Sequence, residues 1–142
     1  MRRKILLFLI AFSLAGCATI VRYTAYTGQV FPRKPGHYFI TIYPSLPPFV
    51  VPSFQAIGKI EVSGYASEGV SPDVLAEKAK IIARQKGADA VINAKTEGVV
   101  FSGVDVVPGH FTRYHYHDAQ YIPYSDTLFT FQGELIVFIN ET

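Results

Sequence analysis

The sequence predicts an α+β fold, in which a small mixed β-sheet of about four strands is covered by one main helix. Residues 71–87 have the apolar spacing and the end signals of an amphipathic helix. The segments on either side alternate between apolar and polar residues, as half-buried strands do. Phe and Tyr are abundant and Trp is absent, which suits a sheet-rich domain. A strand, a helix and a second strand in this order predict a βαβ-like unit.

The first expected strand covers residues 37–43, in which alternate apolar residues share one face. Pro44 ends it, because proline cannot donate a hydrogen bond in the middle of a sheet. The proline-dense residues 45–52 are interpreted as an extended connector across one end of the sheet. The alternative is a polyproline-type ligand for a partner protein.

The helix has signals at both ends. Ser71 is the expected N-cap, Pro72 stands where its missing N–H costs nothing, and Asp73 lies at the positive end of the helix dipole. Gly87 ends the helix after residue 86. Three strands complete the expected sheet, at residues 57–66, 88–100 and 128–140.

The N-terminus has the composition of a signal peptide. A short basic start, Arg2 to Lys4, precedes an almost entirely apolar run over residues 5–15. This run is too short to span a bilayer, because a membrane helix needs about 20 residues. It is followed by two small residues and the only cysteine of the chain, Cys17.

Leu14-Ala15-Gly16-Cys17 resembles the lipobox of bacterial lipoproteins. The resemblance implies cleavage before Cys17, a diacylglyceryl thioether on its sulfur, and acylation of the new amine by a fatty acid such as palmitate. Two or three acyl chains anchor a protein stably. Ala18, where an aspartate often marks retention in the inner membrane, favours the periplasmic face of the outer membrane over the inner membrane. The alternative is a buried core cysteine at the end of a hydrophobic helix.

The expected domain organisation is a signal peptide (1–16), a lipidated N-terminus and tether (17–36) and a single α+β domain (37–142). Removing residues 1–16 removes three of the thirteen basic residues and none of the eleven acidic ones, so the formal charge changes from +2 to 10 − 11 = −1. This balance gives no support for nucleic-acid binding. With Cys17 lipidated, no intramolecular disulfide can form, and stability must come from packing.

Residues 57–64, a helix ending Lys86-Gly87-Ala88-Asp89-Ala90-Val91, and residues 131–137 together resemble the small βαββ domains of the YbjQ-like group, called putative heavy-metal-binding. The resemblance covers about residues 38–139, with an aromatic insertion between 102 and 126. Such domains recur in bacterial lipoproteins, including RcsF-type stress sensors. This chain lacks the paired cysteines of that type, so the resemblance implies a fold rather than an activity.

The insertion holds three of the four histidines, within residues 110–118. On an extended strand His115 and His117 share a face, and neutral imidazoles are good ligands for zinc or copper. His110, of opposite parity, and Asp118 are the remaining candidate ligands in this stretch. A metal site is therefore the alternative hypothesis, and no cofactor is the first expectation.

The same insertion has the residue types enriched at protein interfaces, where large amphipathic side chains bury area at low entropic cost. The residues concerned are Arg113, Tyr114, Tyr116 and Tyr121. The alternative is that these aromatic residues cover the open face of the domain's own sheet. The expected partners are the membrane, through Cys17, and either an envelope protein or a second copy of the chain.

Catalytic motifs are missing from the sequence. No free cysteine remains after lipidation, and there is neither a nucleophile elbow nor a phosphate-cradling loop. A glycosidase needs two carboxylates, which two of Asp105, Asp118 and Asp126 would supply. The spacing of these aspartates does not favour a glycosidase. The expected function is non-catalytic binding, assembly or sensing at the periplasmic face.

Overall fold

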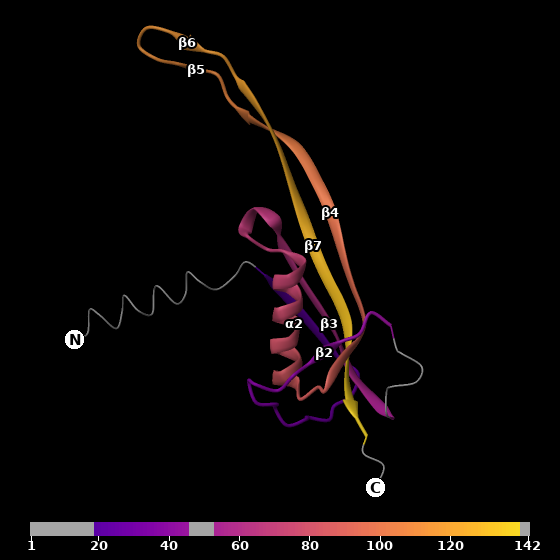
Figure 1. The fold of residues 1–142 in the computed structure, drawn as a ribbon. Helices are drawn as coiled ribbons and strands as arrows, with labels where there is room; N and C mark the ends of the chain where they lie inside the picture. The colour runs from indigo at the N-terminus through magenta and orange to yellow at the C-terminus, as the bar shows by residue number, and fades with distance from the viewer. Residues whose placement is uncertain (1–18, 46–52, 140–142) are drawn as a thin grey trace, which may run out of the picture.

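The computed structural model describes residues 19–45 and 53–139. The Cys17 motif and most of the proline-dense segment lie outside the described residues. One main helix lies against a sheet, and two strands of the sheet continue far beyond it as a long arm (Figure 1). The elements in chain order are β1 (Ile20–Ala25), β2 (Thr41–Ile42), β3 (Phe54–Tyr65), the 3-10 helix η1 (Ala66–Glu68), α2 (Pro72–Lys86), β4 (Ala90–Val107), β5 (His110–Phe111), β6 (Tyr116–His117) and β7 (Gln120–Phe138).

The main sheet has five strands in the order β1-β3-β7-β4-β2. Neighbours are antiparallel, except that β2 runs parallel to β4. Strands β3 and β4, which α2 connects, are therefore parallel to each other with β7 between them. The α+β expectation is confirmed. The sheet has five strands where about four were expected, and β5 and β6 form a separate two-stranded ladder.

Both expected ends of the helix are confirmed. The Ser71 hydroxyl accepts a hydrogen bond from the Val74 N–H at 3.3 Å, which satisfies one of the donors that a helix start leaves free. Pro72 is the first helical residue. Gly87 ends the helix in the left-handed conformation, at φ 80°, which costs glycine no Cβ clash.

The core lies between α2 and one face of the sheet. The helix buries one stripe of apolar side chains, as its spacing predicts. A smaller apolar cluster lies on the opposite face, near the end of the sheet away from the arm. The main cluster includes Ile60, Val62, Leu75, Ala79, Ile82, Val91, Phe131 and Leu135, and the smaller one is built on Ala90, Ile92 and Ile136.

The expectation of a tether over residues 17–36 is wrong for Ile20–Ala25. These residues form the edge strand β1, which pairs with β3 over its whole length, from Ile20 opposite Ser63 to Ala25 opposite Gly58. Tyr23 contributes to the main cluster and its ring lies over Gly58, where a side chain would collide with it. A glycine on β3 therefore makes room for an aromatic residue on β1.

The segment after β1 crosses the C-terminal end of α2. The Lys34 N–H donates to the Arg84 carbonyl at 2.9 Å, and the Arg84 side chain donates to the Tyr38 carbonyl at 2.8 Å. Ile40 is fully buried. Of the strand expected at residues 37–43, Thr41–Ile42 pairs with β4, and the backbone of Tyr43 bonds to Val91 and Ala94. The Tyr38 carbonyl bonds to the helix end instead.

Asp89 joins three parts of the chain. Its carboxylate accepts hydrogen bonds from the Tyr38 hydroxyl and the Phe138 N–H, each at 2.8 Å, and lies 2.7 Å from the Lys34 ammonium. Burial raises the pKa of Asp89, but the bonds from Lys34, Tyr38 and Phe138 outweigh burial and hold the pKa below its ordinary value. The charge of the Asp89 carboxylate is thus explained by its contacts within the fold.

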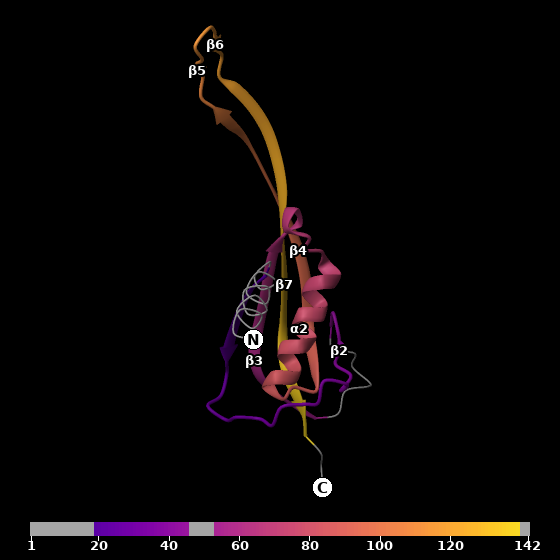
Figure 2. The same ribbon diagram turned by 90° about the vertical axis from the view of Figure 1, so that its left-hand side faces the viewer.

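The strands expected at 88–100 and 128–140 are real but longer than their patterns indicate. β4 continues to Val107 and β7 begins at Gln120. The segment interpreted as an insertion is therefore mostly a continuation of these two strands. They leave the body at the end where η1 lies (Figures 1 and 2).

Candidate functional site

The candidate site is the arm, defined here as residues 99–128 and built from the outer parts of β4 and β7 with the β5–β6 tip. Its two strands pair without a break from Val99 opposite Leu128 to Val107 opposite Gln120. Beyond them, His110 pairs with His117 and Phe111 with Tyr116. The arm is thus a two-stranded ribbon with two faces and two edges.

The two faces of the ribbon differ in charge. Side chains alternate along a strand, and directly opposed residues share a face. What we call the uncharged face continues the parity of the helix-covered side and has no ionisable carboxylate or cation. The other, which we call the acidic face, includes two aspartates. The uncharged face comprises Val100, Ser102, Val104, Val106, Tyr121, Pro123, Ser125 and Thr127; the acidic face comprises Val99, Phe101, Gly103, Asp105, Val107, Gln120, Ile122, Tyr124, Asp126 and Leu128.

Apolar side chains on both faces are exposed. Val104 is 55% exposed and Tyr121 70% exposed on the uncharged face, and Ile122 is 49% exposed on the acidic face. Tyr114, at the tip, is 81% exposed. The alternative that these aromatic residues cover the domain's own sheet is therefore wrong. A cluster of exposed apolar residues on one projection is typical of an interaction site.

The tip is a tight turn over residues 112–115. The Thr112 N–H donates to the His115 carbonyl at 2.7 Å, and the Thr112 hydroxyl donates to the same carbonyl at 3.0 Å. This arrangement leaves Arg113 and Tyr114 at the outermost point, with the guanidinium 5.8 Å from the centre of the tyrosine ring. Behind them, the rings of Phe111 and Tyr116 lie 4.6 Å apart.

The structure groups the histidines differently from the expectation. His110 and His117 are cross-strand partners, and their rings stack with centroids 4.9 Å apart. His115 lies at the end of the turn, where its carbonyl accepts the Thr112 N–H, and its pairing with His117 on one face stays a prediction. Within residues 19–45 and 53–139, no group of three or more His, Cys, Asp or Glu side chains is arranged to hold a metal ion.

The root of the arm is tied to η1. The Asp126 carboxylate accepts hydrogen bonds from the Ser67 N–H at 3.0 Å and from the Ser67 hydroxyl. The Ser67 hydroxyl bond chiefly holds the pKa of Asp126 below its ordinary value, against the raising effect of desolvation. The rings of Tyr65 and Phe101 lie 6.5 Å apart beside these bonds. These contacts fix the point where the arm leaves the body.

Both edges of the arm are open among the described residues. On the β4 side, β2 pairs only with Ala90 and Val91. On the β7 side, β3 pairs no farther than Leu128. Beyond these points the backbone of each arm strand pairs in a ladder only with the other arm strand, so among the described residues each strand presents backbone donors and acceptors outward. Such an edge is a template for a further strand.

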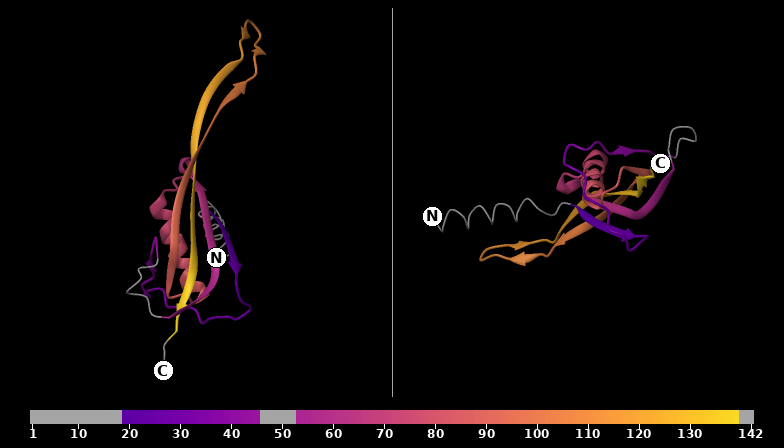
Figure 3. Two further views of the ribbon diagram at one scale, coloured as in Figure 1. Left: turned by 90° about the vertical axis from the view of Figure 1, so that its right-hand side faces the viewer. Right: turned by 90° about the horizontal axis from the view of Figure 1, so that it is seen from below.

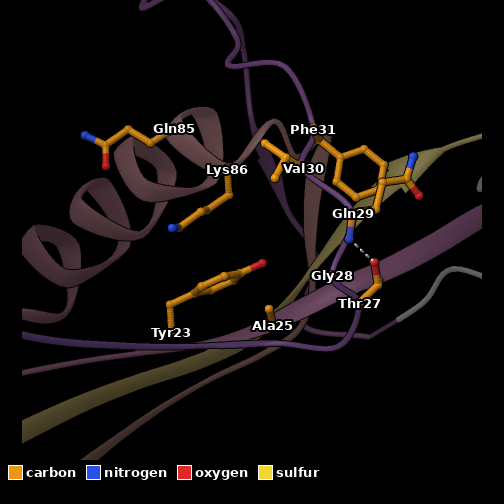
Figure 4. Close-up of a pocket in the computed structure, with 9 residues that line it drawn as sticks. All are labelled: Tyr23, Ala25, Thr27, Gly28, Gln29, Val30, Phe31, Gln85 and Lys86. Atoms are coloured by element: carbon orange, nitrogen blue, oxygen red, sulfur yellow. Dashed lines mark hydrogen bonds between the residues drawn. The ribbon is translucent and has the colours of Figure 1, made fainter.

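Two open hollows lie on the body rather than the arm. One, of about 310 Å³, lies between β1, the segment after it and the end of α2 (Figure 4). There the Lys86 ammonium lies 4.7 Å from the centre of the Tyr23 ring. The other, of about 340 Å³, lies on the polar face of the sheet around the Glu134 carboxylate, which accepts bonds from Tyr26 and Asn93. Lys59 and Lys95 also line the second hollow, and Lys95 forms an ion pair with Glu97.

The sequence placed the tip residues correctly in one region but missed the shaft of the arm. The overlooked residues are 101–107, with Val104, Val106 and Val107 among them, together with their partners at 120–126 on β7. Their signal is β-branched content, which favours strands even where alternation of polar and apolar residues is weak. Alternation is weak there because neither face of the ribbon is buried.

Comparisons with known proteins assign the chain to no family. No protein-family model matches the chain, and no curated protein matches it significantly. Among solved structures, the chain is similar to a Francisella virulence factor, FvfA, with a TM-score of 0.41 and 15% identity over 81% of this chain and 96% of the other. Across the described residues, no helix has the length and apolar character needed to cross a membrane.

Proposed function

We propose that this chain is a lipid-anchored protein of the bacterial envelope, held by acyl chains on Cys17, and that it acts as a non-catalytic binding or assembly module. The observation that carries the proposal is the arm, a ribbon with apolar faces and open edges. A periplasmic location at the outer membrane follows from the lipobox and Ala18. The resemblance to the YbjQ-like group implies only a fold, a βαββ domain, and the order β3–α2–β4–β7 is compatible with that fold.

The arm binds its partner along an open edge. An extended segment of another protein, or the arm of a second copy, can add to the β4 edge and satisfy its backbone groups. The β4 stretch from Val99 to Val107 suits this because its many β-branched residues favour a paired strand. Phe101 and Val107, which are exposed on the acidic face of β4, then supply apolar area for the partner.

Crosslinking in living cells tests the proposal. A photoreactive residue replaces Tyr116, and a matched control places it at Ile81, which is similarly exposed on α2. The expected result is a specific adduct from position 116 and none from position 81. An envelope protein in the adduct identifies the partner, and a self-adduct identifies an oligomer. Equal adducts from both positions, or none from position 116, would contradict a binding role for the arm.

The stacked pair His110 and His117 supports a second candidate function, metal binding at the arm, with zinc or copper as the ion. Two imidazoles on adjacent strands can supply two ligands. Calorimetric titration with Zn²⁺ tests it. If the site is real, changing both residues to alanine abolishes binding while His115→Ala leaves it intact; equal binding by the double variant excludes the site.

A further inference from the structure

The proposed lipid anchor and the arm belong to the same end of the molecule. Ile20, the first residue of β1, pairs with Ser63, two residues before β3 ends at Tyr65. Tyr65 pairs with Leu128, at the root of the arm. Cys17 precedes Ile20 by three residues, and an extended chain spans at most about 3.5 Å per residue. An acyl group on Cys17 is therefore attached within about 11 Å of Ile20.

The arm also bends toward the side on which β1 begins. Figure 1 shows the arm leaning to the side of the sheet that carries α2, and the indigo start of β1 lies on that side too. In the view from below in Figure 3, β1 begins at the edge of the body on the side toward which the tip of the arm extends. A single surface can therefore touch the tip and pass close to the start of β1, to which the proposed anchor is attached.

The chemistry of the arm suits a lipid surface. The charged residues of its paired strands, Asp105 and Asp126, lie on the acidic face, so the uncharged face can enter an apolar environment without burying a charge. At the tip, Phe111 and Tyr114 are the most exposed aromatic residues of the arm. Tyrosine with a neighbouring arginine suits the boundary between headgroups and acyl chains, where one end of a side chain is apolar and the other wet.

We propose that the arm lies on the bilayer that holds the Cys17 acyl chains, with its uncharged face and aromatic tip in the interface and its acidic face toward water. This inference rests on the proposed lipidation. The arm lies along the surface rather than entering the hydrocarbon as an isolated hairpin, because its open edges would leave backbone groups unsatisfied there. In this orientation the β4 edge remains free to receive a partner strand.

Site-specific quenching tests the proposal on the full acylated protein in vesicles of phosphatidylethanolamine and phosphatidylglycerol. Once Cys17 is a thioether, an introduced cysteine is the only free thiol. Single cysteines replace Val104 on the uncharged face, Tyr114 at the tip and Ile122 on the acidic face, and each carries the same fluorophore. Val104 and Ile122 are a matched pair, since they are similarly exposed in the structure. Quenching by brominated lipid and by aqueous iodide is measured for each.

Lipid quenching several-fold stronger at positions 104 and 114 than at 122, with iodide reaching 122 best, is the expected result. Strong iodide quenching at all three positions would overturn the proposal. So would protection of position 104 from both quenchers, which would indicate a protein contact instead. Vesicle flotation and the mass of the N-terminal peptide distinguish failure of the lipid anchor from failure of the arm–bilayer contact. An acylated protein that floats with the vesicles but has an iodide-accessible arm refutes the arm–bilayer contact alone. An unacylated protein refutes the lipid anchor as well.

Discussion

Asp89 lies on the three-residue link between α2 and β4, and its side chain is 9% exposed. A carboxylate this enclosed is stable as a charge only with partners. Lys34, Tyr38 and the Phe138 N–H are those partners, and they come from the N-terminal segment and the last strand. The charge of one residue therefore helps to hold both ends of the domain against its centre.

Replacing Asp89 with asparagine tests this role. We expect Asp89→Asn to lower the free energy of unfolding by about 1–3 kcal/mol at neutral pH, because a buried charged hydrogen bond is lost. The folded pKa lies below the unfolded value, so the stabilisation is present above the unfolded pKa, about 3.9, and is lost as pH falls through the folded pKa. Urea unfolding across this range should show the gap between wild type and variant closing at low pH. Glu68→Gln, in the exposed η1, is the control; an equal effect there would refute the role.

Gly87 provides a second test at the residue scale. Its φ of +80° is unfavourable for other residues, and a Cβ there would collide with the Pro32 carbonyl and approach the Phe31 Cβ to 2.7 Å. Gly87→Ala should therefore destabilise the domain by roughly 1–3 kcal/mol in urea unfolding. Gly36→Ala is the matched control, because nothing lies within 4 Å of its Cβ position. If both variants unfolded alike, the close packing of the N-terminal segment on the helix end would be refuted.

Among the elements, the arm depends most on its root. A two-stranded ribbon is marginally stable by itself in water, so its order beyond the sheet relies on the place where it is held. Ser67 of η1 holds Asp126 there, and the rings of Tyr65 and Phe101 pack beside them. The short 3-10 helix thus braces the arm as well as connecting β3 to α2.

Hydrogen exchange can measure this brace. We expect Asp126→Asn to speed amide exchange in β4 from Val99 to Val107, because the carboxylate that accepts both Ser67 bonds is replaced by a weaker acceptor. Exchange in α2 should stay unchanged, since the arm lies outside the core. Asp105→Asn, on the same face but with no described partner, is the control. Identical exchange in the two variants would show that η1 does not brace the arm.

At the scale of the whole molecule, the described residues form a packed body and a projection that adds no side chain to the apolar clusters of the body. Neither apolar cluster includes a residue of the arm. The body has its helix, its five-stranded sheet and the Asp89 contacts independently of the ribbon. Selection for stability of the body does not explain the arm, which supports the proposal that it acts on something outside this domain.

Shortening the arm tests this separation. Joining Gly103 to Tyr124 through an Asn-Gly turn, which favours a tight hairpin, removes the tip and the outer shaft. We expect thermal unfolding followed by circular dichroism to give a melting temperature close to that of the full chain. The variant lacks residue 116, so the crosslink from that position is lost. A large fall in melting temperature would instead show that the arm is part of the folding unit.

Local signals determined much of the body. Ser71, Pro72 and Gly87 specified the helix to its ends, because capping and left-handed turns depend on residues a few positions apart. The α+β class followed from alternating segments around that helix. Cys17 and its lipobox are likewise read from adjacent residues, so the sequence by itself also supplied the anchor hypothesis.

Only the tertiary structure decided the features that join distant residues. The sequence of β1 predicts a polar tether, and only its pairing with β3 shows that it is a strand. Asp89 has the sequence context of a surface residue, and only the structure shows that Lys34 and Tyr38 contact it. His110 meets His117 because a turn reverses the chain between them. The sequence did not predict the arm for a related reason. Polar and apolar residues alternate along a strand when one face of it is buried. The arm is held by hydrogen bonds between its own two strands and buries neither face, so its sequence lacks that alternation.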